Sequence, residues 1–309
     1  MNETVLILGS AGKLGSDLCL TLQTTCKVVG ATRAQADITN LRRLKEFLRE
    51  VNPSIIVNAA GYTDVDGCES NPDEAFRVNA LGARNAAIAA RGAGAKLVHV
   101  STDYVFDGTK KEPYTEDDVP HPLSVYGASK LLGESLVKEQ TKEFFIVRTA
   151  WLYGATGKDF VRTMLRLLDE RDELTVVDDQ RGSPTCSADL AAQIRSLMMT
   201  DFYGTYHGAS HGSCSWYEFA AEIFRCTGHS LSRNPDGPGW LVDRGEARTS
   251  LVLRPVPTAE FPRPAARPMN SVLENRMLKL ERLDEMPEWK DAIVRFLGYN
   301  PRDPEGGGT

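Results

Sequence analysis

The sequence predicts a doubly wound α/β fold with a second, smaller lobe at its C-terminal end. Five short β-branched runs in the first half have the pattern of buried strands, at residues 4–9, 27–32, 54–60, 96–102 and 144–150. Segments with helical spacing of apolar residues separate them, at 13–23, 39–51, 72–92 and 124–140. A parallel sheet covered by helices on both faces requires this alternation of near-continuous apolar strands and helices.

The composition excludes several classes of protein. With 309 residues, 41% of them hydrophobic, the chain can bury a sizeable core and form about two lobes. Its net charge of −6 and its lack of a long basic run argue against a nucleic-acid partner. No signal-peptide pattern opens the chain, and no apolar run approaches the roughly 20 residues needed to span a bilayer. The six cysteines lack the Cys-x-x-Cys spacing of a metal or redox site, so we expect reduced thiols in a cytoplasmic protein without a membrane partner.

Glycines follow the first predicted strand at intervals of three residues. Gly9, Gly12 and Gly15 stand where this strand turns into the first helix. Glycines at such a turn permit a tight bend and let the backbone approach a pyrophosphate, which the amides of the helix N-terminus then bind. The spacing is GxxGxxG rather than GxGxxG, and its strand–turn–helix context predicts a Rossmann-type dinucleotide site.

The residues after the second strand indicate which dinucleotide binds. An acidic side chain there would accept hydrogen bonds from the ribose 2′-hydroxyl of NAD, whereas an arginine can pair with the 2′-phosphate of NADP. The chain has Arg33 first and Asp37 four residues later. We therefore predict NADPH as the cofactor, with NADH as the alternative. The competing interpretation is that Arg33 is an exposed loop charge.

Tyr126 and Lys130 stand four residues apart in VYGASK, on one face of a predicted helix. Reduction of a carbonyl group needs a hydride at carbon and a proton at oxygen. The pKa of free tyrosine is about 10, and a neighbouring ammonium group would lower it. We therefore expect Lys130 to lower the pKa of Tyr126. Ser101 and Thr102, at the end of the fourth strand, supply hydroxyls that could orient the substrate carbonyl.

Eight motifs, in order along residues 4–298, resemble the extended short-chain dehydrogenase/reductases and, among these, the dTDP-4-dehydrorhamnose reductases. They are GSAGKLG, NAAGYTDVDGCE, VNALGARN, STDYVFDG, YGASK, RTAWLYG, DQRGSPT and RPMNS. The dehydratases of this superfamily usually carry an acidic dipeptide after the threonine, whereas here Tyr104 follows Asp103. The epimerases favour an acidic residue where this chain has Arg33. The resemblance therefore implies a reductase.

The resemblance also implies roles for the matching residues. The catalytic triad would be Thr102, Tyr126 and Lys130. The cofactor site would comprise Gly9, Ala11, Gly12, Lys13, Leu14, Gly15, Arg33, Asp37, Ile38, Asn58, Ala59, Ala60, Thr63, Asn79 and Ser101, together with Tyr126 and Lys130. The substrate site would comprise Asp103, Val105, Trp151, Gln180, Arg267, Asn270 and Ser271. In this site Trp151 would stack on the sugar or base, and Arg267 would suit its diphosphate.

The second half of the chain has a looser pattern. Helices are predicted at 158–171, 215–227, 271–280 and 288–297, with a short strand at 204–209. We assign residues 1–157 to an NADP-binding Rossmann-type domain, 158–300 mainly to a substrate-binding lobe, and 301–309 to a flexible tail, with about 174–200 returning to the first domain. The stretch 227–255 is longer than the resemblance leads one to expect. It is either a surface insertion or a part that reshapes the nucleotide side of the substrate pocket.

The resemblance implies NADPH-dependent reduction of the C4 keto group of a dTDP-4-keto-6-deoxy sugar, from dTDP-4-dehydro-L-rhamnose to dTDP-L-rhamnose, a precursor of surface polysaccharide. Two alternatives stay open: another nucleotide-sugar reductase or epimerase, and a non-catalytic dinucleotide-binding subunit similar to that of methionine adenosyltransferase. Some members of the family are dimers linked by magnesium. Asp17 and Asp189 lie near the matching places without a full carboxylate set, so we assign no metal ligands, leave a magnesium requirement open, and expect a monomer or a homodimer.

Overall fold

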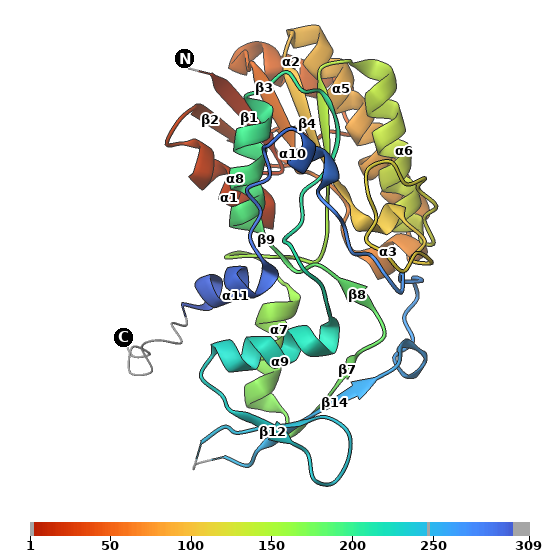
Figure 1. Ribbon diagram of the computed structural model, residues 1–309. Helices are drawn as coiled ribbons and strands as arrows, with labels where there is room; N and C mark the ends of the chain where they lie inside the picture. The colour runs from red at the N-terminus through yellow and green to blue at the C-terminus, as the bar shows by residue number, and fades with distance from the viewer. Residues whose placement is uncertain (1–2, 246–247, 299–309) are drawn as a thin grey trace.

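A six-stranded parallel sheet forms the centre of the computed structural model, which describes residues 3–245 and 248–298 (Figure 1). The strand order is β10-β5-β4-β3-β1-β2. The strands are β1 Thr4–Leu8, β2 Lys27–Ala31, β3 Ile55–Asn58, β4 Lys96–Thr102, β5 Phe144–Thr149 and β10 Gly204–His207. The predicted fold class is thereby confirmed, because all five strands expected in the first half lie in one parallel sheet.

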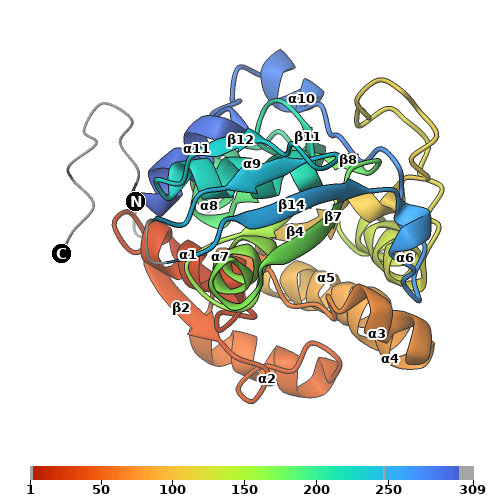
Figure 2. The ribbon, with the colours of Figure 1, turned by 90° about the horizontal axis from the view of Figure 1, so that it is seen from below.

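Helices cover both faces of this sheet (Figures 1 and 2). α1 (Lys13–Leu22) and α8 (Ser187–Met198) pack on one face, and α2 (Leu41–Val51), α5 (Gly82–Ala93) and α6 (Val125–Gln140) pack on the other. Within β1, Val5 and Ile7 contact the first face while Leu6 and Leu8 contact the second. All four side chains are fully buried, which explains why the strand is apolar without alternation.

Capping side chains define where several helices begin. Asn40 caps α2, Ser124 caps α6, Asp159 caps α7 (Phe160–Glu170), and Ser215 caps α9 (Trp216–Cys226). In α9 the cap is reciprocal, because the Glu218 side chain accepts a hydrogen bond from the Ser215 backbone amide. These caps agree with the predicted helix starts to within about two residues.

The helix predicted at 72–92 is divided into α4 (Pro72–Phe76), a π-helical turn η1 (Arg77–Leu81) and α5. A further short helix, α3 (Val65–Ser70), precedes it and was not predicted. The π turn contains Asn79, whose side chain is buried and bonds to both backbone groups of Tyr62. Insertions of this kind often occur at functional sites, where they reorient one side chain.

The smaller lobe is built around a four-stranded sheet in the order β12-β13-β14-β7, which shares one apolar core with α7 and α9 (Figure 2). α11 (Trp289–Leu297) packs on α9, where Trp289 contacts Phe219. Its strands are β7 Glu173–Val177, β12 Leu231–Arg233, β13 Trp240–Val242 and β14 Leu251–Val256. Two-stranded pairs join β6 (Leu152–Tyr153) to β9 (Thr185–Cys186) and β8 (Arg181–Gly182) to β11 (Cys214–Ser215). Single turns and short helices complete the described chain at η2 Asp103–Val105, η3 Thr258–Glu260 and α10 Arg276–Leu280.

The structure corrects the predicted placement of two segments and shows where a third lies. Of the range 174–200 expected to return to the first domain, α8 packs on the large sheet, whereas β7 pairs with β14 in the small sheet. β10 was expected in the lobe, but it pairs with β5 and completes the large sheet. The stretch 227–255 forms a hairpin, β12–β13, that continues the small sheet through β14. The predicted tail at 301–309 lies outside the described residues. In the described part of the chain, no helix has the length and apolarity to cross a membrane.

Substitutions at two glycines test the packing of the first turn. A Cβ atom on Gly15 would overlap the carbonyl oxygen of Gly9 and lie 2.8 Å from the Cα of Ser10, whereas a Cβ on Gly92 meets nothing within 4 Å. We expect G15A to lower the free energy of unfolding by about 1–3 kcal/mol through overpacking. The control G92A should raise it by roughly 0.5–1 kcal/mol, since alanine favours helix. Urea denaturation measures both, and equal effects of the two substitutions would contradict the predicted packing.

Candidate active site

Two adjoining cavities lie at the carboxyl ends of the large sheet. The first, the glycine-loop cavity, has a volume of about 630 Å³ and is lined by residues of the turn after β1 and of the segment after β2. The second, the triad cavity, has a volume of about 500 Å³ and reaches the end of β4 and the start of α6. Gly12, Ala59, Ala60 and Gly61 line both. The two cavities are therefore halves of one cleft, at the edge where such sheets bind ligands.

The glycine turn is built to receive an anionic group. Gly9 has a φ of +82°, and a Cβ there would lie 2.8 Å from the amide nitrogen of Ala60. α1 begins after Gly12 without a side-chain cap and without an acidic residue in its first turn. The amides and the positive end of the helix dipole are thus left for a ligand, and these residues fit a dinucleotide pyrophosphate.

Most of the predicted cofactor residues line the cleft, and three of them do not. The residues that line the cleft are Gly9, Ala11, Gly12, Lys13, Leu14, Arg33, Asp37, Ile38, Ala59, Ala60, Thr63 and Ser101, with Tyr126 and Lys130. Gly15, Asn58 and Asn79 line neither cavity. Asn58 bonds to the ring of His99 and to the amide of Ala60, so it supports the cleft wall from behind. Lys13 bridges to the smaller lobe, with its ammonium group 2.6 Å from Asp159.

Arg33 lies at the outer rim of the glycine-loop cavity, and its side chain is 68% exposed. Its guanidinium is 3.6 Å from both Asp37 and Glu74, which are weak ion pairs. Asp37 accepts hydrogen bonds from the amide and hydroxyl of Thr39. Although partial burial raises the pKa of Asp37, these bonds and the charge of Arg33 bring it below its ordinary value. Of Arg33, Asp37 and Glu74, Arg33 is therefore the side chain that can turn toward a ligand.

Thr102, Tyr126 and Lys130 come together in the triad cavity, and all three are buried. Thr102 ends β4, while Tyr126 and Lys130 occupy successive turns of α6. Lys130 donates a hydrogen bond of 2.5 Å to the carbonyl oxygen of Val100. The strand end and the helix N-terminus therefore deliver the three side chains to one place, as the sequence predicted.

The electrostatic relation between Tyr126 and Lys130 differs from the prediction. Burial raises the pKa of Tyr126 above its ordinary value, and the Thr102 hydroxyl only partly offsets this. The net shift of the Tyr126 pKa is therefore upward, opposite to the lowering expected from Lys130. Burial also lowers the pKa of Lys130 itself to about 8. Tyr126 is thus protonated at neutral pH, which is the state that a proton donor needs.

Asp103 lies directly beside the triad and is almost fully buried. It accepts a 3.0 Å hydrogen bond from the Thr102 hydroxyl. Burial raises the pKa of Asp103 to about 6, although hydrogen bonds from Ser271 and Thr102 act in the opposite direction. Ser271 accordingly supports Asp103 from behind and lines none of the cavities described here.

The predicted stacking residue, Trp151, is itself stacked on another indole. Its ring lies 3.5 Å from that of Trp216 with an interplanar angle of 5°, and Phe160 packs against Trp216 at 4.7 Å. The backbone of Trp151 has a φ of +45°, which is unusual for an aromatic residue and is typical of a constrained functional position. The sequence did not reveal Trp216, because the capping pattern locates the start of α9 without showing what its first side chain contacts.

A third cavity, the lobe cavity, has a volume of about 720 Å³ and adjoins the triad cavity through Tyr104, Phe160 and Trp216. Gln180 and Arg267 line it, as expected for substrate-binding residues. Arg267, however, makes a bidentate ion pair with Asp66 at 2.7 and 2.9 Å, so its charge is already matched. Its neighbour Arg263 stands farther from this carboxylate, at 3.9 Å, and was not predicted.

The remaining predicted substrate residues do not line the lobe cavity. Val105 is fully buried in an apolar cluster with Phe106 and Tyr114. The Asn270 side chain donates to the backbone carbonyl of Lys110 at 2.8 Å. Neither residue lines the cleft or the lobe cavity, and sequence alone could not separate this arrangement from direct contact.

The acidic residues near the expected metal position have protein partners. Asp189 forms a 2.5 Å ion pair with Arg295, and Asp17 accepts a hydrogen bond from Ser187. In the ranges that the structure describes, no group of three or more His, Cys, Asp or Glu side chains could hold a metal ion. These residues therefore do not fit a magnesium site within one chain.

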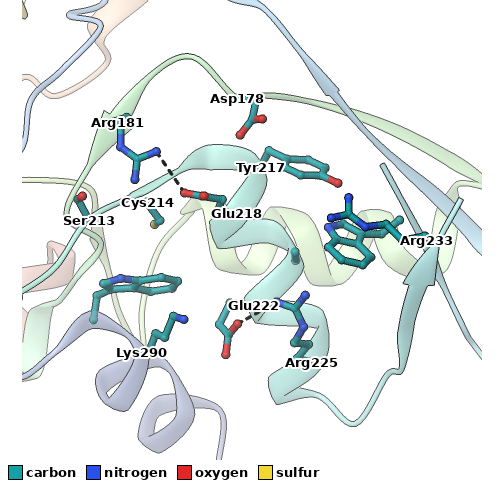
Figure 3. A pocket seen from close by; sticks show the side chains of 13 residues that line it. Asp178, Arg181, Ser213, Cys214, Tyr217, Glu218, Glu222, Arg225, Arg233 and Lys290 are labelled. Carbon is teal, nitrogen blue, oxygen red and sulfur yellow. Dashed lines mark hydrogen bonds and ion pairs between the residues drawn. The ribbon is translucent and has the colours of Figure 1, made fainter. Parts of the chain in front are cut away.

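A fourth cavity, of about 440 Å³, shares no lining residue with the other three. Figure 3 shows Arg181 directed at Glu218 and Arg225 at Glu222, with separations of 3.5 and 3.0 Å. The hairpin within 227–255 contributes Arg233, which lies over the ring of Trp240 at 4.4 Å. The described residues of that stretch thus contribute Arg233 and Trp240 to this separate cavity and no lining residue to the other three.

Comparison with known proteins gives one consistent family. The family model described as "RmlD substrate binding domain" matches residues 3–300. A dTDP-4-dehydrorhamnose reductase of Burkholderia thailandensis is 38% identical, with 94% of this chain and 96% of that protein covered. A dTDP-4-keto-6-deoxy-D-glucose reductase of Streptomyces niveus is 40% identical, with 82% and 88% covered.

The solved structures agree. The crystal structure of dTDP-4-dehydrorhamnose reductase from Bacillus anthracis in complex with NADP superposes with a TM-score of 0.87 and 42% identity. The alignment covers 97% of this chain and all of that one. The similarity therefore includes the cleft and the smaller lobe.

Replacing Asp103 with asparagine tests the burial of its charge. The pKa of Asp103 rises to about 6 on folding, from about 3.9 in an unfolded chain, so the native protein binds this proton more tightly. The free energy of unfolding therefore falls as the pH rises through this range. We expect D103N to be more stable than wild type by about 3 kcal/mol at pH 7 and by much less at pH 4, measured by urea denaturation.

Asp107 provides a control, because its pKa shifts in the opposite direction. Hydrogen bonds from Thr109 and Tyr114 lower it. D107N should lose stability at pH 7 relative to pH 4. The same stability difference for D103N at both pH values would contradict the assignment.

Proposed function

This chain belongs to the RmlD substrate binding domain family, and from that premise we propose that it is an NADPH-dependent dTDP-4-dehydrorhamnose reductase. It reduces the C4 keto group of dTDP-4-dehydro-L-rhamnose and forms dTDP-L-rhamnose, a nucleotide sugar used for surface polysaccharide. The observation that carries the proposal is the meeting of Thr102, Tyr126 and Lys130 in a cavity continuous with the glycine-loop cavity.

The cleft would hold the cofactor across its two halves. The glycine turn and the N-terminus of α1 would bind the pyrophosphate, and Arg33 would bind the 2′-phosphate. Lys130 would hold the ribose at the triad end, where NADPH supplies the hydride that reduces the carbonyl carbon.

The triad would supply the proton and stabilise the phenolate that remains after the proton is transferred. Tyr126, protonated at neutral pH, would donate its hydroxyl proton to the C4 oxygen of the sugar. The hydroxyl of Thr102 would polarise the carbonyl and then stabilise the phenolate left on Tyr126. The charge of Lys130 would favour the same phenolate once the proton has moved.

The substrate would extend from the triad cavity into the lobe cavity. The paired indoles of Trp151 and Trp216 form the wall between them and offer an apolar surface to the sugar or base. Arg263, half-exposed and as far as 3.9 Å from the Asp66 carboxylate, would supply the cation for the diphosphate, because Arg267 is already paired with Asp66.

A second candidate is a reductase of another dTDP-keto-sugar, because a relative of that kind is 40% identical. A non-catalytic dinucleotide-binding subunit is disfavoured, since such a subunit does not need a tyrosine and a lysine facing the cavity. We further propose a cytoplasmic monomer or homodimer without a nucleic-acid partner. The six cysteines, all of them free, suit a reducing compartment.

Replacing Tyr126 with phenylalanine tests the reductase mechanism. Loss of the proton donor should lower kcat by about 10²–10⁴-fold. The assay follows NADPH oxidation with a panel of dTDP-, GDP- and UDP-linked keto-sugars, and we expect turnover with dTDP-4-dehydro-L-rhamnose. If wild type shows no turnover, or Y126F matches it, the proposed function is wrong. Turnover of only another keto-sugar would favour the second candidate.

Replacing Arg33 with glutamine tests the choice of cofactor. Loss of one charge-assisted contact to the 2′-phosphate should raise the KM for NADPH by roughly tenfold and leave the KM for NADH unchanged. The matched control is R42Q, since Arg42 is an exposed arginine of α2 that lines none of the cavities. Equal changes in both KM values, or none, would show that Arg33 is only an exposed loop charge.

A further inference from the structure

We propose that Glu134 is a positioning residue for the reductase reaction, which holds the ammonium group of Lys130 charged and aimed at the triad cavity. The inference rests on the proposed function for its role in turnover. Its physical part concerns residues of this chain alone and can be tested without cofactor or substrate.

Glu134 follows Lys130 by one turn of α6, and both side chains are buried, at 1% and 5% exposed. Residues four apart on a helix lie on the same face. Sequence reasoning passed over Glu134, because an acidic residue within a helix is usually a solvated surface charge. Its near-complete burial behind a predicted catalytic lysine is therefore an observation that needs a physical cause.

Three groups hold the Glu134 carboxylate in place. Arg148 of β5 binds it through two hydrogen bonds, of 2.9 and 2.7 Å, and the Ser101 hydroxyl of β4 donates a third at 2.6 Å. The carboxylate is thus fixed between the helix and the two strands whose ends form the triad cavity. A rigid anion beneath Lys130 fixes the direction of the electric field on its ammonium group.

A buried ammonium group keeps its charge only when a nearby anion stabilises it. Taking Lys130 out of water disfavours its charged form, and burial indeed lowers its pKa to about 8. The charge of Glu134 opposes the effect of burial and raises this pKa. The only hydrogen bond described for the Lys130 ammonium goes to the Val100 carbonyl, so two of its protons are left for groups in the cavity.

The other groups facing Lys130 do not supply this charge. On β4, burial and then the charge of Lys130 hold the pKa of His99 well below its ordinary value, so His99 is neutral. On β5, Arg148 is a cation, and on α6, Tyr126 is protonated. Asp103 faces the Thr102 and Tyr126 side of the cavity. Glu134 is therefore the buried anion that acts on Lys130.

The test is a pH titration of Lys130 in the cofactor-free protein, with lysine labelled with carbon-13 at the ε position. The Lys130 resonance is assigned by its loss in K130R. We expect a midpoint near pH 8 for wild type. In E134Q the midpoint should fall by about one pH unit, since the favourable charge is gone. The matched control E139Q removes an exposed carboxylate from the same helix and should leave the midpoint unchanged.

E134Q leaves the Arg148 charge buried and unpaired, which threatens folding. The double variant E134Q/R148M removes both charges. Because loss of a nearby cation can only raise the pKa of Lys130, a midpoint that stays below wild type in the double variant isolates the effect of the carboxylate. No fall of the midpoint in E134Q, or a midpoint in the double variant equal to that of R148M alone, would overturn the proposal.

Activity gives the second readout. In E134Q and the double variant, the alkaline limb of the pH profile of kcat should move down with the Lys130 midpoint, while E139Q keeps the wild-type profile. A merely structural role predicts lost stability with an unmoved limb, and that result would also overturn the proposal. If wild type reduces no keto-sugar, the proposed function fails, and the titration still decides what Glu134 does to Lys130.

Discussion

The hydrogen bonds of the buried Glu134 carboxylate fix the position of α6 relative to the large sheet. The rest of the site depends on that position. The bonds fix α6 against β4 through Ser101 and against β5 through Arg148. In parallel strands these residues lie near one common edge of the sheet, so a slip of α6 by one residue would break all three bonds. The same slip would carry Tyr126 and Lys130 away from Thr102. Breaking a buried pair of this kind is costly, because it leaves an uncompensated charge in the interior.

The cleft also depends on how the lobe closes over the sheet. Lys13 of α1 pairs with Asp159 at the start of α7, and Arg267 pairs with Asp66 in the wall of the lobe cavity. The Arg267–Asp66 pair is partly exposed and contributes little stability by itself, whereas the Lys13–Asp159 pair is largely buried. The stacked indoles of Trp151 and Trp216, with Phe160 beside them, supply an apolar contact that stabilises the lobe against the sheet.

Sequence reasoning succeeded where a local pattern determines the structure. The β-branched runs predicted five strands of the sheet, the glycine spacing predicted the turn at Gly9, and the spacing of Tyr126 and Lys130 placed both on one helix face. It failed where only tertiary packing decides. No local pattern shows that β10 returns to the large sheet, that Trp216 covers Trp151, or that Arg267 is already paired. The effect of burial on the pKa of Tyr126 belongs to the same class, since burial depends on the whole fold.

The burial of Tyr126 keeps its hydroxyl protonated and so prepares it to donate a proton to the substrate. An alkoxide is a stronger base than a phenolate, so the proton donor need not be a strong acid; it must still carry its proton when the alkoxide forms. Tyr126, with its raised pKa, meets that condition at every physiological pH. Lys130, with a pKa of about 8, is charged over most of the same range and can stabilise the phenolate that remains. The buried triad is thus prepared for reduction before any ligand arrives, and the carboxylate that keeps Lys130 charged is part of that preparation.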